Sequence, residues 1–61
     1  MTASRENIKK LCEKTNCTFK DDKFTDDNNI TYKYSVKNHN NNELHRFKLL
    51  IEVFYYLRDL L

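Results

Sequence analysis

The last nineteen residues, from Glu43 to Leu61, constrain the fold of this chain more than any other stretch. They contain no Gly and no Pro, and twelve of their side chains are apolar or aromatic. Because nothing in this stretch interrupts helical hydrogen bonding, the pattern predicts one continuous helix, about 28 Å long at about 1.5 Å per residue. A helix of that length is large for a 61-residue chain, so we expect the other elements to be arranged around it.

Projected at helical spacing, this segment has more apolar surface than a small monomer buries. One broad face carries the side chains of Leu44, Phe47, Leu50, Ile51, Phe54 and Leu61. A second line, whose members are spaced four, three and four apart, consists of Leu49, Val53, Tyr56 and Leu60. A helix packed on one side needs a single apolar stripe. We therefore expect the second line to contact another protein or a second copy of the chain, with Arg58 as a polar anchor at its rim.

Residues 5–15 have the pattern of a shorter amphipathic helix. Its apolar stripe comprises Ile8, Leu11, Cys12 and Thr15. The hydroxyl of Ser4 can accept a hydrogen bond from the first turn, and Asn16 can adopt the left-handed conformation that ends a helix. Both signals predict the same helix boundaries.

Two stretches of alternating residues predict a β-hairpin. Residues 17–20 alternate over a short span, and residues 30–37 alternate throughout. The apolar face of the second stretch consists of Ile30, Tyr32, Tyr34 and Val36. Between the two stretches, Phe24 is out of phase with Phe19, so either the strand bulges near residues 21–22 or Phe24 belongs to a loop.

These elements predict a single α+β domain over residues 1–61 with the order α-β-β-α. A two-stranded antiparallel hairpin alone is marginally stable in water, so we expect it to pack on the long C-terminal helix through Phe47, Ile51 and Phe54. Residues 38–42 are expected to be the loop that leads into this helix, with Asn40 and Glu43 forming a variant capping box.

Length and charge exclude several functional classes. A chain of 61 residues buries only about 60% of the surface that its unfolded form exposes, which leaves little volume for a substrate pocket. We therefore expect no enzymatic activity, no cofactor and no small-molecule substrate. The net charge is only +2, divided into +3 for residues 1–20, −3 for residues 21–29 and +2 for residues 30–61. Strong non-specific nucleic-acid binders carry a more lopsided charge.

The sequence predicts a cytoplasmic protein that does not enter a membrane. It has no apolar N-terminal run of the kind found in secretory signals. The only hydrophobic stretch near membrane length is the last one, and it is interrupted by Lys48, Glu52, Arg58 and Asp59. We therefore expect Cys12 and Cys17 to be free thiols in a reducing, intracellular compartment.

Two cysteines and two histidines form a set of zinc-ligand types. The set consists of Cys12, Cys17, His39 and His45. The pairs are separated by 21 residues, whereas a zinc finger has about 12 to 15 between them. The alternative interpretation is two small buried thiols and two surface histidines, and on this interpretation the chain holds no metal.

Six lysines offer a second candidate site. They are Lys20, Lys33 and Lys37 on the outward face of the predicted hairpin, and Lys9, Lys10 and Lys14 on the first helix. A sheet face with lysine and threonine can follow the phosphates of a nucleic acid. The tyrosines of the hairpin point to its other face, so this surface has no aromatic platform for stacking bases.

The segment Glu6-Asn7-Ile8-Lys9-Lys10-Leu11-Cys12-Glu13-Lys14-Thr15-Asn16-Cys17-Thr18-Phe19-Lys20 resembles part of the KH domain. In that family a helix of this kind leads through a Thr-Gly-Ala corner into a strand that ends in a basic residue, and a second strand and a C-terminal helix follow. The family grips single-stranded RNA with a Gly-x-x-Gly loop, where this chain has Thr2-Ala3-Ser4-Arg5, and the family's preceding strand and helix have no counterpart here. The resemblance implies a small KH-like protein that binds single-stranded nucleic acid.

The excess apolar surface of the last segment favours a different function. We predict a non-catalytic protein-binding module, a small inhibitor or adaptor that forms a homodimer or docks through its C-terminal helix. In size and element order the chain resembles the small inhibitors that phages encode, such as anti-CRISPR proteins. Its abundant Asn and Lys are typical of AT-rich phage or viral genomes. Nucleic-acid binding through the six lysines is the alternative.

Overall fold

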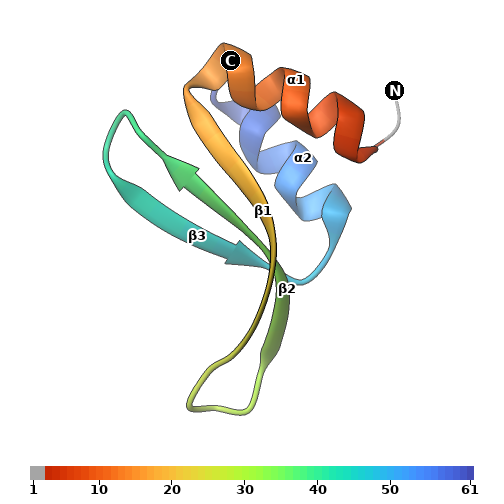
Figure 1. The fold of residues 1–61 in the computed structure, drawn as a ribbon, viewed down its shortest axis with the longest axis vertical. Helices are drawn as coiled ribbons and strands as arrows, with labels where there is room; N and C mark the ends of the chain where they lie inside the picture. Colours follow the sequence, from red (N-terminus) through yellow and green to blue (C-terminus); the bar gives the residue numbers. More distant parts are fainter. Residues whose placement is uncertain (1–2) are drawn as a thin grey trace.

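A computed structural model describes residues 3–61 of the chain. The elements follow the order α1 (Arg5–Thr15), β1 (Cys17–Thr25), β2 (Thr31–Asn38), β3 (Glu43–Phe47) and α2 (Leu50–Asp59). The strands form one antiparallel sheet with β2 in the centre. Both helices pack on the same face of this sheet, and neither helix of residues 3–61 covers the other face (Figure 1). The α+β class is confirmed, but the sheet has three strands rather than the two predicted.

The first helix has the predicted boundaries and the predicted caps. The Asn7 backbone N–H donates to the Ser4 Oγ at 3.1 Å, which satisfies a donor that the first turn leaves unpaired. Asn16 has a φ of 57° in the left-handed region, and its N–H donates to the Cys12 carbonyl. Asparagine thus provides the C-terminal cap that glycine usually provides.

The predicted nineteen-residue helix is wrong over its first seven residues. Residues Glu43–Phe47 form β3, a bend follows, and α2 begins only at Leu50. The segment satisfies a two-residue period as well as a helical one, because His45 and Phe47 point to the helices while Leu44 and Arg46 point away from them. As β3, it pairs with the second edge of β2, whose backbone groups would otherwise lack partners.

A bulge in β1 explains why Phe24 is out of phase. The β1–β2 register shifts between Asp21 and Phe24, as expected when one strand contains an extra residue. Beyond the bulge the two strands continue as an arm that extends past the helices (Figure 1). At its tip, the carboxylate of Asp26 accepts hydrogen bonds from the backbone N–H groups of Asn28 and Ile30, so the acidic tip is an ordered turn.

The β2–β3 connection is a turn built from asparagines, and not the helix cap predicted for Asn40 and Glu43. The Asn40 side chain donates to the Thr15 carbonyl at 2.8 Å and to the Asn38 Oδ1 at 3.0 Å. It therefore ties this turn to the end of α1. Among residues 3–61, the positive-φ positions are Asn16, Asn29 and Asn42. Asparagine tolerates this left-handed conformation, which explains how a chain without glycine forms its tight turns.

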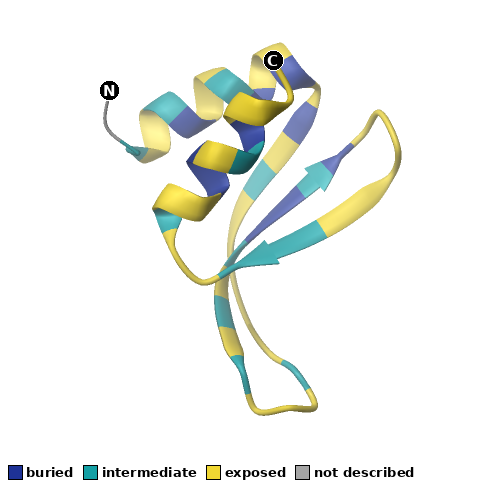
Figure 2. Cartoon of the chain, turned by 180° about the vertical axis from the view of Figure 1, so that it is seen from behind, coloured by how far each residue is buried: buried dark blue, intermediate teal, exposed yellow. Residues whose placement is uncertain are grey.

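The core lies between the sheet and the two helices (Figure 2). Its buried apolar members are Ile8, Cys12, Cys17, Val36, Val53, Phe54 and Leu57. Of the three residues predicted to hold the hairpin, Phe54 is buried and Phe47 is half-buried, whereas Ile51 is exposed. Because α2 begins at Leu50, its packing on the sheet leaves the Ile51 side chain facing solvent. The predicted contact between Ile51 and the hairpin is therefore wrong.

Candidate docking surfaces

The predicted docking line is divided between the core and the surface. Val53 has an exposed fraction of 0%, and Tyr56 is half-buried with its ring 4.8 Å from the His45 ring centroid. The Asn38 side chain also donates to the Tyr56 hydroxyl at 3.3 Å. Leu49 and Leu60 are exposed, but they lie at opposite ends of α2. The central pair of the predicted line therefore supports the sheet instead of facing solvent.

The outward side of α2 carries a different apolar surface. Ile51 is 39% exposed and Tyr55 is 48% exposed, and their spacing of four places them on the same side of the helix. The Arg58 guanidinium lies 4.9 Å from the centroid of the Tyr55 ring, so the predicted polar anchor adjoins this surface. We call Ile51, Tyr55 and Arg58 the α2 outer face.

The sequence contained one signal for this face. Tyr55 and Tyr56 are adjacent, so on a helix their rings must point in different directions, which indicates that at least one of them lies near the surface. A projection that began at Glu43 assigned the exposed position to Tyr56. The structure assigns it to Tyr55, because the helix begins at Leu50 and its orientation is set by the sheet.

Exposed apolar side chains are concentrated at the C-terminal end of the chain. The large apolar side chains that are exposed among residues 3–61 are Phe24, Leu44, Leu49, Ile51, Tyr55, Leu60 and Leu61. Five of these seven belong to α2 or flank it directly. Among residues 3–61, most of the large apolar side chains that are exposed therefore lie on or beside α2.

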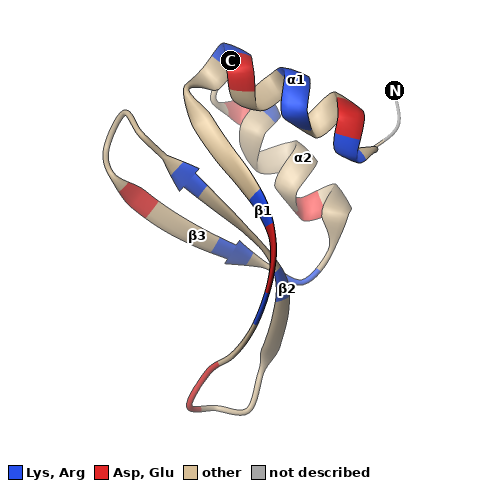
Figure 3. Ribbon diagram, viewed as in Figure 1, with Lys and Arg blue, Asp and Glu red and all other residues tan. Residues whose placement is uncertain are grey.

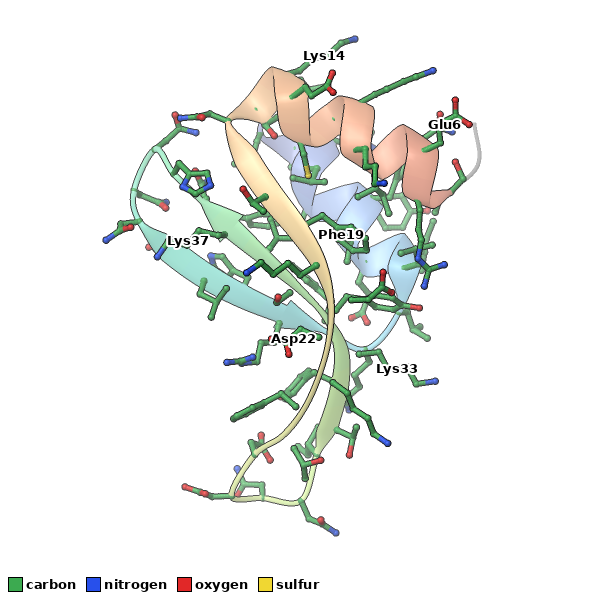
Figure 4. The ribbon with its side chains drawn as sticks, viewed as in Figure 1. Glu6, Lys14, Phe19, Asp22, Lys33 and Lys37 are labelled. Atoms are coloured by element: carbon green, nitrogen blue, oxygen red, sulfur yellow. The ribbon has the colours of Figure 1, made fainter. Side chains whose placement is uncertain are left out.

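The six predicted lysines do not form one continuous surface. Lys9, Lys10 and Lys14 lie on α1 in the helix layer, and Figure 4 shows that Lys14, Lys33 and Lys37 occupy separate parts of the molecule. The Lys10 Nζ is also 3.8 Å from the Glu6 carboxylate. Acidic and basic residues are interspersed along α1, β1 and β3 (Figure 3). Of the six, Lys20 and Lys37 line one hollow on the face of the sheet that neither helix of residues 3–61 covers.

The cysteines and histidines are not gathered into a metal site. Cys12 and Cys17 are free, buried thiols, and the Cys17 thiol points to the Thr15 carbonyl at 3.5 Å. His39 is exposed beside the Thr18 hydroxyl at 2.7 Å, and His45 lies 3.0 Å from the Glu43 carboxylate. Across residues 3–61 no group of three or more metal-binding side chains comes together.

Burial changes the chemistry of one of these thiols. Desolvation, with a smaller contribution from the neighbouring Cys17, raises the pKa of Cys12 to about 11. A thiol with that pKa is almost entirely protonated at neutral pH, and the thiolate is the reactive form. Cys12 is therefore a core side chain and not a nucleophile.

The helix-free face of the sheet has a shallow hollow at its centre. Strand register places two rows of side chains across it: Thr18, Lys37 and Leu44 form one row, and Lys20, Ser35 and Arg46 form the other. Serine is the smallest of these residues, so its position is a depression between longer neighbours. The hollow measures about 220 Å³ and is lined by Thr18, Lys20, Asp22, Ser35, Lys37 and Leu44. We call these six residues and Arg46 the open sheet face.

Arg46 lies at one edge of the open sheet face, where it contacts two residues of β1. Its guanidinium lies 3.9 Å from the Phe24 ring centroid and 3.5 Å from the Asp22 carboxylate. The Arg46 Nη1 atom is covered and has no hydrogen-bond partner within the described residues. Arg46 therefore joins β3 to the base of the arm, and its charge is largely balanced by Asp22.

No family model matches the chain, and neither the curated proteins nor the solved structures yield a match to it. Neither helix within residues 3–61 is long and apolar enough to cross a membrane. Of the four positions that align with the KH loop, Thr2 lies outside the described residues, Ala3 is half-buried, and Ser4 and Arg5 are engaged in the cap and an ion pair.

Proposed function

We propose that this chain is a non-catalytic protein-binding module that self-associates through the α2 outer face. The observation that carries the proposal is the concentration of exposed apolar side chains on and beside α2. Contiguous apolar surface on a small soluble domain commonly marks an interaction site. Tyrosine and arginine are also the residue types most enriched among the energetically dominant positions of interfaces.

The Tyr55 ring already has two side-chain contacts in the free chain. The Arg58 guanidinium lies over it, and the Phe54 ring packs against its edge with the centroids 5.9 Å apart. A side chain that is already ordered loses little rotamer freedom on binding. Tyr55 is therefore suited to be the central contact of an interface.

The available area indicates weak association. The described chain has an accessible surface of 4410 Å², and a standard interface covers about 800 Å² on each partner, which would be almost a fifth of it. Three side chains on one helix cover less than that, even with Leu49 and Leu60 added. We expect a homodimer with a dissociation constant in the micromolar range.

The charges beside the α2 outer face favour a parallel arrangement of two copies. At helical spacing, Glu52 and Asp59 lie on one flank of Tyr55 and Arg58 on the other. If the two copies of α2 run parallel and are related by a two-fold axis along them, the acidic flank of one copy of α2 lies against the basic flank of the other, as in parallel coiled coils. An antiparallel arrangement would bring like charges together.

Sedimentation velocity from low to high micromolar concentration tests this proposal. The unaltered chain is expected to shift from monomer to dimer, and Tyr55→Ser is expected to weaken the dimer about tenfold, equivalent to about 1.4 kcal/mol. Leu44→Ser is the matched control, because it removes an exposed apolar side chain from a different face. A monomer at every concentration, or equal weakening by both variants, would contradict the proposal.

Binding of single-stranded nucleic acid remains the second proposal, supported by the position of Lys20 and Lys37 on one face. The scatter of the other four lysines weighs against it, since phosphate contacts add up only along a continuous path. A titration with single-stranded RNA over a salt series tests it. Absence of binding at low salt, where phosphate contacts are strongest, would dismiss it.

A further inference from the structure

We propose that the open sheet face binds an extended acidic segment of a partner protein. In this arrangement one carboxylate of the segment lies over Ser35 between Lys20 and Lys37, and an aliphatic side chain of the segment packs on Leu44. The site lies across the sheet from the helices, so it does not depend on the α2 outer face.

The shape of the site follows from the register of the strands. Ser35 lies in the central strand, directly opposite Lys20 on one neighbour and Arg46 on the other. Their long side chains leave it only 3% exposed, although no helix covers this face. The hollow of about 220 Å³ is several times the volume of a water molecule, about 30 Å³, so it can admit a carboxylate group.

The charge of this face is complementary to an acidic partner. Lys20, Lys37 and Arg46 contribute +3 and Asp22 contributes −1, giving +2, which equals the net charge of the whole chain. The rest of the protein is therefore neutral on balance. Arg46 and Asp22 form an ion pair with each other, whereas Lys20 and Lys37 take part in none of the ion pairs found in residues 3–61. These two ammonium groups are the uncompensated charge of the face.

Leu44 adds an apolar contact at a suitable distance. It is 51% exposed, and it lies directly opposite Lys37. Ser35 and Leu44 are diagonal neighbours on adjacent strands, a relationship that places residues about 7–8 Å apart. Alternate residues of an extended chain are separated by about 6.6 Å. An acidic residue and an aliphatic residue two positions apart would therefore reach both places.

The same face is less suited to a nucleic acid. Binding of single strands without sequence preference relies on aromatic rings that stack on the bases. The exposed rings beside this face are those of Phe24 and His39. The Arg46 guanidinium already covers Phe24 at 3.9 Å, and the small His39 ring lies 2.7 Å from the Thr18 hydroxyl. Lys20 and Lys37 can attract phosphates, but successive bases would have no series of rings to stack on.

Fluorescence anisotropy with a labelled peptide that repeats Glu-Ser-Leu-Ser, which places Glu and Leu two positions apart on one side of an extended chain, tests the proposal. We expect saturable binding that weakens as salt is added. Lys20→Glu with Lys37→Glu is expected to abolish it, whereas Lys10→Glu with Lys14→Glu, an identical change in net charge on α1, is expected to preserve it within about twofold. Equal loss in both double variants would show that only the net charge matters and would overturn the proposal.

A neutral variant tests the hollow itself. Ser35→Leu fills the depression without altering any charge, and we expect it to weaken peptide binding at least tenfold. Thermal unfolding of each variant checks that the fold is retained, and Ser35→Ala provides a second variant that keeps the hollow open and is expected to bind. Unchanged binding by Ser35→Leu would overturn the proposed binding position of the carboxylate over Ser35.

Two further measurements distinguish this site from the other candidate sites. Repeating the titration with Tyr55→Ser distinguishes the two surfaces, since loss of self-association should leave peptide binding unchanged. A single-stranded RNA of matched length is the competitor. If the RNA displaces the peptide and binds more tightly, with the same dependence on Lys20 and Lys37, the occupant is a nucleic acid and the acidic-segment proposal is wrong.

Discussion

Arg5 and Asp21 form a two-point ion pair that fastens the first turn of α1 to the bulge of β1. The Arg5 Nη2 lies 2.6 Å from the Asp21 Oδ1, and the Arg5 Nε lies 3.2 Å from Oδ2. The two residues are sixteen positions apart in sequence, and both side chains are about half exposed. Asp21 is still paired in regular register opposite Tyr34, and strand alternation places it on the same face as Phe19, the face that the helices cover.

The Arg5–Asp21 pair predicts reduced stability in acid. The hydrogen bond from Arg5 lowers the pKa of Asp21 below its ordinary value of 3.8, so the folded state favours the ionised carboxylate. This contribution is present above the unfolded pKa and is lost as the pH falls through the lower, folded pKa. Melting temperatures between pH 2 and pH 6 should therefore drop more steeply below pH 4 for the unaltered chain than for Asp21→Asn. Parallel curves would show that the pair does not contribute.

Leu57 and Leu60 allow a matched test of which side of α2 is core. Leu57 is fully buried and Leu60 is exposed. Leu57→Ala should destabilise the fold by about 2–5 kcal/mol, a large part of the stability of a small domain, whereas Leu60→Ala should change it by no more than about 0.5 kcal/mol. Urea unfolding followed by circular dichroism measures both. Similar losses for the two variants would contradict the observed orientation of α2.

The buried Cys12 thiol should be unreactive in the native protein. Its pKa of about 11 keeps it protonated, and packing excludes reagents. We expect alkylation by iodoacetamide at pH 8 to be slow in buffer and fast in guanidinium chloride, as measured by mass spectrometry. Rapid labelling of Cys12 without denaturant would show that α1 opens readily.

The same raised pKa predicts a loss of stability in base. The folded state keeps the Cys12 proton up to about pH 11, whereas the ordinary pKa of a cysteine thiol is 9.0. Stability from this group is therefore complete below pH 9 and declines as the pH rises from 9 to 11. Cys12→Ala should remove this part of the decline, although it lowers stability at every pH by leaving a cavity.

Asn29 should tolerate glycine better than alanine. Its φ of 64° lies in the left-handed region, where an ordinary side chain costs about 1–2 kcal/mol. Asn29→Ala should therefore lower the free energy of unfolding by about 1 kcal/mol, and Asn29→Gly should leave it nearly unchanged or slightly higher. Thermal melts of the three proteins distinguish these outcomes, and identical melts would show that the turn at the end of the arm adjusts freely.

Local signals were sufficient for the first half of the chain. Ser4 and Asn16 predicted both ends of α1 because capping depends on hydrogen bonds within a few residues. The phase of Phe24 offered a bulge as one of two alternatives, and the β1 register confirms it. The alternation of residues 30–37 predicted β2 with a shift of one residue. These features rest on contacts between neighbours in sequence, which a pattern can reveal.

The second half depended on partners that are distant in sequence. Nothing between Glu43 and Leu61 breaks a helix, so the residues themselves allow either a long helix or a strand followed by a shorter one. The free edge of β2 decided between them, because its backbone groups gain partners only if Glu43–Phe47 forms β3. That choice moved the start of α2 to Leu50 and allowed the sheet to set its rotation. As a result, Val53 lies in the core and Tyr55 faces outward. The amount of apolar surface was a property of the sequence, but which side of the helix exposes it was decided by tertiary packing.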